Sequence, residues 1–180
     1  GLQEPAPDSS SETPKDSAKA LAPDFELPDP SGALHKLSDF RGKVVVIEWL
    51  NHGCPYVKKH YGAGNMQKLQ AETAAKGAVW LSICSSAEGK EGYHTAAEWP
   101  GVIAEHKSVA THVLLDPKGH VGRRYQAKVT PHMFVIDAAG AVAYQGAIDD
   151  NKSADPATIP GATNYVMATV DALLAGQPAP

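Results

Sequence analysis

The sequence predicts an α/β protein with a central mixed β-sheet and helices on both faces. Two apolar, β-branched runs at residues 44–50 and 78–84 are short and bounded by turn residues, which is typical of strands buried on both faces. A helical segment lies between them, so the three elements predict a right-handed βαβ unit with parallel strands. Residues 132–137 and 141–146 are joined by a short turn and predict an antiparallel hairpin.

The other expected elements surround this framework. The helix that follows the first buried strand should weaken near Gly62 and Gly64, because glycine is a poor helix former, and should be most secure over residues 65–75. In chain order, we also expect a short strand at 24–27, a turn at 28–32, a helix at 96–106, a strand at 113–116, helical turns at 121–127 and a terminal helix at 163–175.

Length and composition favour a single folded domain. The chain has 180 residues, of which 43% are hydrophobic and 20% are charged. Its net charge of −4 argues against nucleic acid as a partner, because phosphate binding needs clustered Lys and Arg. No apolar run approaches the ~20 residues of a transmembrane helix, and we expect no cofactor.

The composition changes along the chain and suggests domain limits. Residues 1–21 are rich in Pro, Ser and charged residues, and such a segment buries too little surface to fold. We therefore expect a disordered leader at 1–21, a folded domain at 22–176 and a tail at 177–180. A polar leader of this kind can tether an exported domain to a membrane, which favours a periplasmic or other extracytoplasmic bacterial location.

Cys54 is the residue whose position most clearly predicts chemistry. It follows the first buried strand and precedes Pro55, which suits the first position of a helix. The free N–H groups and partial positive charge of a helix N-terminus stabilise a thiolate, which is the nucleophilic form of cysteine. Cys84, the only other cysteine, ends the second buried strand.

Three segments carry a resemblance to a known group. The opening Ala22-Pro23-Asp24-Phe25 with Gly42-Lys43 before the strand, the run Cys54-Pro55-Tyr56-Val57, and Val129-Thr130-Pro131-His132 resemble thioredoxin-like redoxins of the TlpA, ResA and AhpC/TSA type. Within that group, the chain is most similar to a peroxiredoxin-like branch with a single active-site cysteine. The resemblance covers about residues 22–175 and implies a thioredoxin-like fold.

The resemblance also implies roles for individual residues. Cys54 takes the place of the attacking thiol, and Pro131 that of the cis-proline that faces it. Glu48 takes the place of a buried acid that handles protons, and burial in a strand should raise the pKa of its carboxyl group. The residues implied around the substrate are Pro55, Tyr56, Thr130 and His132.

Two departures from the group's motifs leave the reaction open. Position 57, where a CxxC motif places its second cysteine and peroxiredoxins place their peroxidatic cysteine, is Val57. A second thiol must therefore come from Cys84, a low-molecular-weight thiol or a partner protein. Cys84 would resolve Cys54 if the two strand ends bring the sulfurs within bonding range. It could equally be a buried strand residue without a redox role.

Histidine is abundant, with eight residues. His52 and His132 flank the two site segments and could exchange a proton with Cys54, or join it in a copper or zinc site. The spacing of four others does not suggest ligands, and we expect them on the surface: His94, His106, His112 and His120.

Four functions remain open at this point. The first is a thiol-disulfide oxidoreductase, with Cys54 attacking a protein or small-molecule disulfide and a thiol partner as reductant. The second is a peroxiredoxin-like antioxidant peroxidase, in which Cys54 becomes a sulfenic acid. The third is a metal-handling module built on Cys54, His52 and His132. The fourth is a binding domain that keeps the fold without chemistry.

Overall fold

A five-stranded mixed sheet forms the centre of the computed structural model, which describes residues 20–180. The strand order is β5-β4-β3-β6-β7. The first three of these pair in parallel, whereas β6 is antiparallel to β3 and β7 to β6. The parallel pair β3–β4 and the antiparallel hairpin β6–β7 are the two pairings that the sequence predicts. The strands are β3 (Val45–Trp49), β4 (Val79–Cys84), β5 (His112–Leu115), β6 (His132–Ile136) and β7 (Val142–Gly146).

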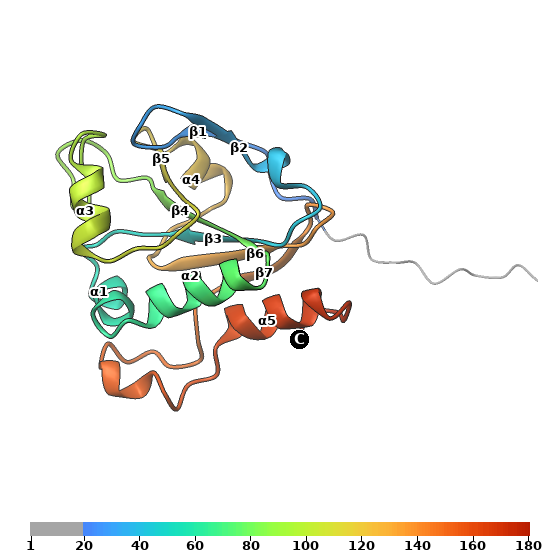
Figure 1. Ribbon diagram of the computed structural model, residues 1–180. Helices are drawn as coiled ribbons and strands as arrows, with labels where there is room; N and C mark the ends of the chain where they lie inside the picture. The colour runs from blue at the N-terminus through green and yellow to red at the C-terminus, as the bar shows by residue number, and fades with distance from the viewer. Residues whose placement is uncertain (1–19) are drawn as a thin grey trace, which may run out of the picture.

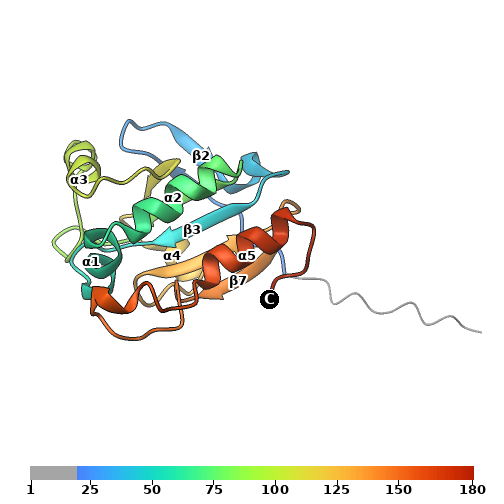
Figure 2. The ribbon, with the colours of Figure 1, turned by 60° about the horizontal axis from the view of Figure 1, so that its bottom comes forward.

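Helices cover both faces of this sheet (Figure 1). The helices are α1 (Pro55–Gly62), α2 (Asn65–Ala75), α3 (Trp99–Glu105), α4 (His120–Arg124) and α5 (Tyr165–Leu174), with short 3₁₀ turns at Leu37–Phe40 and Pro156–Thr158. On one face, α2 and α5 run side by side (Figure 2). The opposite face carries α4 and a small hairpin of β1 (Glu26–Pro28) and β2 (Leu34–Lys36).

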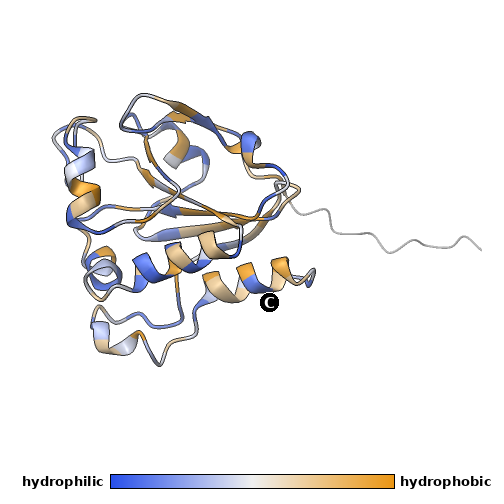
Figure 3. Cartoon of the chain, in the orientation of Figure 1, coloured by the Kyte–Doolittle hydropathy of each residue, from blue (hydrophilic) through white to orange (hydrophobic). Residues whose placement is uncertain are grey.

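The alternation of side chains along β3 divides the core into two layers. Val46 and Leu50 pack toward α1, α2 and α5, whereas Val45, Ile47 and Trp49 pack toward α4 and the β1–β2 hairpin. All five residues of the strand are buried, so its apolar run reflects burial on both faces. Figure 3 shows the apolar character of the central strands against the more polar outer surfaces of the helices.

Several element boundaries differ from those that the sequence predicts. The helical segment expected after Cys54 is divided into two helices near Gly62 and Gly64, where the sequence predicts its weak point. The chain turns at Gly64, whose φ of 76° is in the left-handed region that favours glycine. Helix α3 begins at Trp99 and not at residue 96, which places Pro100 in the first turn, where its missing N–H costs nothing. The pairing of β1 with β2 makes the turn at 28–32 a hairpin, and the short strand β2 has no apolar pattern that would predict it.

The expected leader falls almost entirely outside the described residues, which begin at Ala20. Leu21 forms an isolated antiparallel bridge with Ala141, beside the start of β7. Within residues 20–180, no helix is long and apolar enough to cross a membrane.

Candidate functional site

Cys54 is the N-cap residue of α1, at the end of a tight loop that follows β3. The side chain of Asn51 builds this loop, since its Oδ1 accepts a hydrogen bond from the amide of Gly53 at 2.8 Å. The Asn51 carbonyl accepts the amide of Cys54 at 2.9 Å, and the Cys54 carbonyl in turn accepts the amide of Lys58 at 2.9 Å. The thiol therefore lies at the end of the helix where backbone N–H groups are unpaired.

The loop at residues 85–94 lies closely against the loop that carries Cys54. Asn51 donates from Nδ2 to a carboxylate oxygen of Glu91 at 3.1 Å. A Cβ at Gly53 would overlap the Glu91 side chain, and one at Gly92 would overlap the Asn51 side chain. The two loops therefore pack closely enough that a larger residue at either glycine would displace a neighbouring side chain.

The Cys54 thiol faces the loop that precedes β6. Its Sγ donates a hydrogen bond to the carbonyl oxygen of Thr130 at 3.1 Å, and the Thr130–Pro131 peptide bond is cis. The Cys54 side chain is partly exposed. The structure therefore brings together Cys54, Thr130 and Pro131, the three residues that the sequence places at the centre of the site.

An open pocket of about 440 Å³ lies beside this contact. Its apolar side is formed by Pro131 and by three exposed large side chains, namely Tyr56 (44% exposed), Val129 (66%) and Tyr165 (38%). These are three of the seven exposed large apolar side chains in the described chain, so apolar exposure concentrates at the pocket. Its polar side is formed by His60 and by Asp149, Asp150, Asn151 and Lys152 in the loop after β7.

Glu48 is fully buried in the middle of β3 and belongs to a polar cluster under α1 and α2. Its carboxylate oxygens accept hydrogen bonds from Tyr61 at 2.7 and 2.9 Å, Ser82 at 2.6 Å and Trp80 at 2.9 Å, and Gln70 lies at 3.4 Å. Each partner donates, which is the arrangement that an ionised carboxylate needs in a protein interior. Cys54 is not among these partners.

Burial raises the pKa of Glu48, and the hydrogen bonds from Ser82, Tyr61, Trp80 and Gln70 oppose that rise. Burial and the neighbouring carboxylate together raise the pKa of Tyr61 well above its ordinary value. The expected burial of Glu48 and the direction of its pKa are therefore both present in the structure, and its role in proton transfer stays a prediction.

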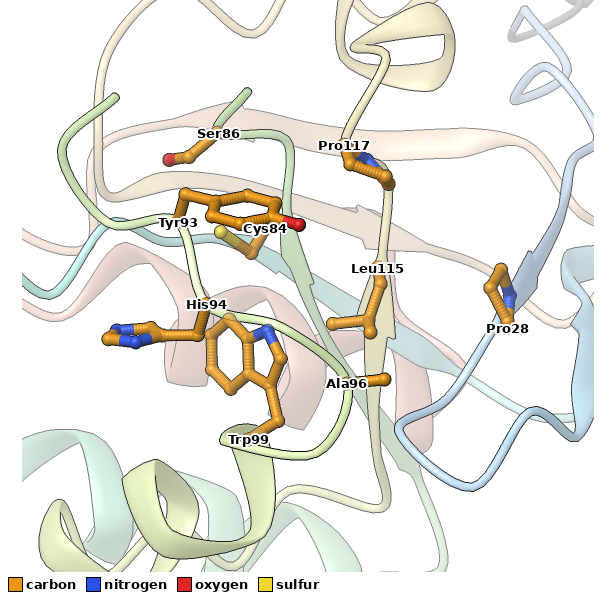
Figure 4. Close-up of a pocket in the computed structure, with 9 residues that line it drawn as sticks. All are labelled: Pro28, Cys84, Ser86, Tyr93, His94, Ala96, Trp99, Leu115 and Pro117. Atoms are coloured by element: carbon orange, nitrogen blue, oxygen red, sulfur yellow. The ribbon is translucent and has the colours of Figure 1, made fainter. Parts of the chain in front are cut away.

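Cys84 lies at the end of β4, and its thiol faces a different loop from that of Cys54. Its Sγ lies 3.5 Å from the carbonyl oxygen of Gly92, and burial raises the pKa of the thiol. The sulfur lines a pocket of about 250 Å³, together with Tyr93, Trp99 and Leu115 (Figure 4). Both cysteines are free thiols, so whether Cys84 ever bonds to Cys54 stays open.

The histidines near Cys54 occupy separate environments. His52 is buried and stacks flat on His106, with ring centroids 3.7 Å apart, and meets Tyr61 edge-on. Burial, with further contributions from His106 and His94, lowers the pKa of His52 to about 3. His132 stacks on Phe134 in the other core layer, and burial lowers its pKa.

These positions bear on one alternative and correct one expectation. Within residues 20–180, Cys54, His52 and His132 do not bring their donor atoms within 4.8 Å of one another, so they do not form the metal site considered as an alternative. Of the four histidines expected on the surface, only His120 is exposed. Three are partly buried because they pack against other rings: His94 meets Trp99 edge-on, His106 stacks on His52, and His112 lies tilted against His35.

The mixed sheet, the cysteine at a helix N-cap and the facing cis-proline loop define a thioredoxin-like redoxin. Residues 18–145 match the AhpC/TSA family, and the chain belongs to that family. It is also 31% identical over 121 residues to the thioredoxin-like protein YneN of Bacillus subtilis, a match that covers 67% of this chain and 66% of that protein.

Solved structures support the same class. A conserved protein from Geobacillus kaustophilus superposes with a TM-score of 0.78 at 25% identity, covering 90% of this chain and 84% of that one. A protein from Chlorobium tepidum assigned as the thiol:disulfide interchange protein DsbE matches with a TM-score of 0.57 at 30% identity, covering 71% and 82% of the two chains.

Proposed function

We propose that this protein is a thiol-disulfide oxidoreductase in which Cys54 is the attacking nucleophile. The observation that carries the proposal is the placement of the Cys54 thiol. It caps α1 and lies 3.1 Å from the carbonyl oxygen of Thr130, a residue that lines an open pocket. The assignment of the Chlorobium tepidum relative as a disulfide interchange protein supports the same reaction class.

The reaction begins with the Cys54 thiolate attacking one sulfur of a substrate disulfide. A bond forms between Cys54 Sγ and that sulfur, the substrate S–S bond breaks, and the second substrate sulfur leaves as a thiolate that takes up a proton. The N-terminus of α1 favours negative charge at the attacking sulfur. The thiol form donates to the Thr130 carbonyl, so proton loss also frees the sulfur from that contact.

A second thiol then attacks the mixed disulfide and regenerates Cys54. Val57 occupies the position of a CxxC resolving cysteine and is fully buried, so the second thiol comes from outside that motif. A low-molecular-weight thiol or a partner protein reaches the exposed side of Cys54 directly. Cys84 would need the loop at residues 85–94 to move, because its sulfur faces Gly92 within that loop.

Glu48 is proposed as the residue that accepts and returns protons during these steps. Its pKa is raised, which brings the carboxyl group closer to the neutral range in which a general base operates best. Since Cys54 is not a direct partner of Glu48, the proton would pass through an intervening group or water. Glu48 is therefore a positioning and proton-handling residue and not one that touches the substrate.

The pocket favours a disulfide carried by a polypeptide. Tyr56, Val129 and Tyr165 present apolar surface in the pocket that Thr130 also lines. The backbone of Thr130, which contacts Cys54, offers hydrogen-bonding groups to an extended chain. An extracytoplasmic location and a membrane tether through the leader remain part of the proposal, supported by the polar composition of residues 1–21.

A peroxidase activity is the second candidate, and membership of the AhpC/TSA family favours it. In that reaction, the Cys54 thiolate attacks a peroxide oxygen and the O–O bond breaks. Cys54 becomes a sulfenic acid and an alcohol or water leaves; two reductant thiols then restore the thiol and form their own disulfide.

Steady-state assays separate the two candidates. With a thiol reductant present, we expect the wild-type protein to reduce protein disulfides, Cys54→Ser to be inactive and Cys84→Ser to retain activity. Consumption of hydrogen peroxide that depends on Cys54 and exceeds disulfide turnover would favour the peroxidase. Absence of both activities would leave a binding domain that keeps the fold.

A further inference from the structure

Three side chains with metal-binding atoms meet on the far side of the molecule from α2 and α5. Asp29 lies in the turn of the β1–β2 hairpin, His35 in β2, and His112 at the start of β5. One donor atom from each lies within 4.8 Å of the other two. Over residues 20–180, no other trio of His, Cys, Asp or Glu side chains reaches this spacing.

The contacts within this trio hold its side chains close together. His35 Nε2 lies 2.8 Å from Asp29 Oδ2, and the His35 ring lies against the His112 ring with centroids 4.0 Å apart. The other carboxylate oxygen, Asp29 Oδ1, holds the hairpin turn by accepting hydrogen bonds from the amide of Ser31 at 2.8 Å and its hydroxyl at 2.6 Å. Asp29 thus has one oxygen committed to the turn and one directed at the histidines.

The fold brings the trio together from separate segments. His112 is on the same side of β5 as Leu114, which packs in the core layer under the β1–β2 hairpin. Figure 1 shows the hairpin over this edge of the sheet, on the face opposite α2 and α5. Strand β4 separates β5 from β3, so the trio is distinct from the Cys54 site.

We propose that Asp29, His35 and His112 bind a divalent transition metal ion of the Zn²⁺ type. Two imidazole nitrogens and one carboxylate oxygen suit Zn²⁺ and its first-row neighbours, whereas Ca²⁺ and Mg²⁺ prefer oxygen ligands and Cu⁺ prefers sulfur. Neighbouring ligands of a tetrahedral Zn²⁺ lie about 3.3 Å apart. Asp29 and His35 therefore need to separate only slightly from their 2.8 Å contact.

Solvent can supply the remaining ligands. All three side chains are partly buried and none is fully enclosed. Asp29 and His112 also line an open hollow of about 450 Å³, together with Ser31 and Thr111. Three protein ligands leave a coordination position open to solvent, in contrast to the four protein ligands of a closed structural site.

A bound ion would connect the β1–β2 hairpin to the edge strand β5. A two-stranded hairpin is only marginally stable by itself, and an edge strand gains from being covered. Because the unfolded chain does not hold these three residues together, the ion would bind the folded protein preferentially and raise its Tm. The expected effect is on stability and not on the thiol chemistry.

The test uses Zn²⁺ titration by calorimetry, and Co²⁺ as a spectroscopic probe, on the full chain carrying Cys54→Ser so that the reactive thiol cannot contribute a ligand. We expect one equivalent of Zn²⁺ to bind and to raise the Tm by several degrees. His112→Gln and Asp29→Asn should each weaken binding at least tenfold and abolish the Tm shift. Asp29→Asn keeps an acceptor at the Oδ1 position, so the hairpin turn is preserved.

His120→Ala is the matched control, because it removes an exposed histidine outside the trio. It should bind Zn²⁺ as tightly as the parent protein. Binding that is equal in the parent and in His112→Gln, or that is lost in His120→Ala, would overturn the proposal, as would the absence of saturable binding in the parent. Circular dichroism of each metal-free variant verifies its fold, and the ligand-field spectrum of Co²⁺ distinguishes a specific site from surface adsorption.

Discussion

The thiol of Cys54 donates a hydrogen bond to the carbonyl oxygen of Thr130, 76 residues later in the chain, at 3.1 Å. This contact joins the helix that positions the sulfur to the loop that leads into β6. The Cys54 side chain stays partly exposed, and Thr130 itself lines the neighbouring pocket. The proposed reaction depends on this exposure, and the predictions below test its consequences.

The two cysteines should differ strongly in reactivity. Cys54 is partly exposed, whereas Cys84 is 5% exposed and burial raises the pKa of its thiol. At neutral pH, we therefore expect iodoacetamide to modify Cys54 at least tenfold faster than Cys84 in the native protein. Peptide mapping by mass spectrometry measures both rates in one sample. Unfolding in urea, where both cysteines should react at the same rate, is the reference. If the two cysteines also react at the same rate in the native protein, Cys54 is not the more reactive thiol.

Replacing Glu48 should impair turnover without abolishing binding. Glu48→Gln keeps the shape of the side chain but cannot take up a proton, so we expect the disulfide-reduction rate at neutral pH to fall about 100-fold, as for loss of a general base. The side-chain amide of the variant also places an N–H donor against the four groups that donate to Glu48. This mismatch lowers the free energy of unfolding by about 1–3 kcal/mol. Glu105→Gln, on an exposed part of α3, is the matched control and should retain full activity. An unchanged rate in Glu48→Gln would remove Glu48 from the mechanism.

Tyr61 should be one of the groups that influence the pH at which Glu48 ionises. Its hydroxyl donates to both carboxylate oxygens and so favours the ionised form. Tyr61→Phe removes this support, and the already raised pKa of Glu48 should rise further. The acidic limb of the pH–rate profile should therefore move to higher pH. A profile that keeps its position, in a variant that stays folded, would show that Glu48 does not control this limb.

His52 should make the protein sensitive to acid. The pKa of His52 is about 3 in the folded state and close to 6.5 in the unfolded chain. The unfolded state therefore binds more protons between pH 6.5 and 3, and the free energy of unfolding falls with decreasing pH across this window by up to about 1.4 kcal/mol per unit from this group. His52→Phe retains a ring against His106 and cannot titrate, so urea unfolding should show a shallower decline. Identical slopes would contradict the buried, neutral state of His52.

The apolar side of the pocket beside Thr130 should contribute to recognition of protein substrates. Tyr56→Ala removes a half-exposed ring beside Cys54, and we expect KM for a protein disulfide to rise about tenfold with kcat unchanged. Turnover of a small disulfide should be unaffected, since a small substrate does not reach the apolar side of the pocket. Leu34→Ala removes another exposed apolar side chain, from the β1–β2 hairpin outside this pocket, and serves as the control. Equal effects on both substrates would assign Tyr56 to the chemistry and not to binding.

Local sequence patterns predicted the central elements well because strands that are buried on both faces appear in the sequence as continuous apolar runs. Both apolar runs became the central strands β3 and β4, and the weak point at Gly64 became the boundary between α1 and α2. The position of Cys54 before Pro55 predicted its place at the helix N-cap. Each of these depends on residues that are neighbours in the chain.

Contacts between distant segments could not be predicted in the same way. The donors around Glu48 come from α1, α2 and β4, and nothing in the spacing of Tyr61, Gln70 and Ser82 indicates that they meet. His112 has no ligand-like spacing to other histidines, yet the fold places it against His35. Such clusters depend on the packing of the hairpin and helices onto the sheet, which a sequence pattern does not encode.

The most direct test of the proposed function is the location of the mixed disulfide. The Cys84→Ser protein is mixed with a slight excess of oxidised glutathione, quenched with acid and mapped by mass spectrometry. The proposal predicts glutathione attached to Cys54, and no adduct in Cys54→Ser under the same conditions. An unmodified Cys54 after prolonged incubation, in protein whose thiol reacts when unfolded, would show that Cys54 is not the attacking nucleophile.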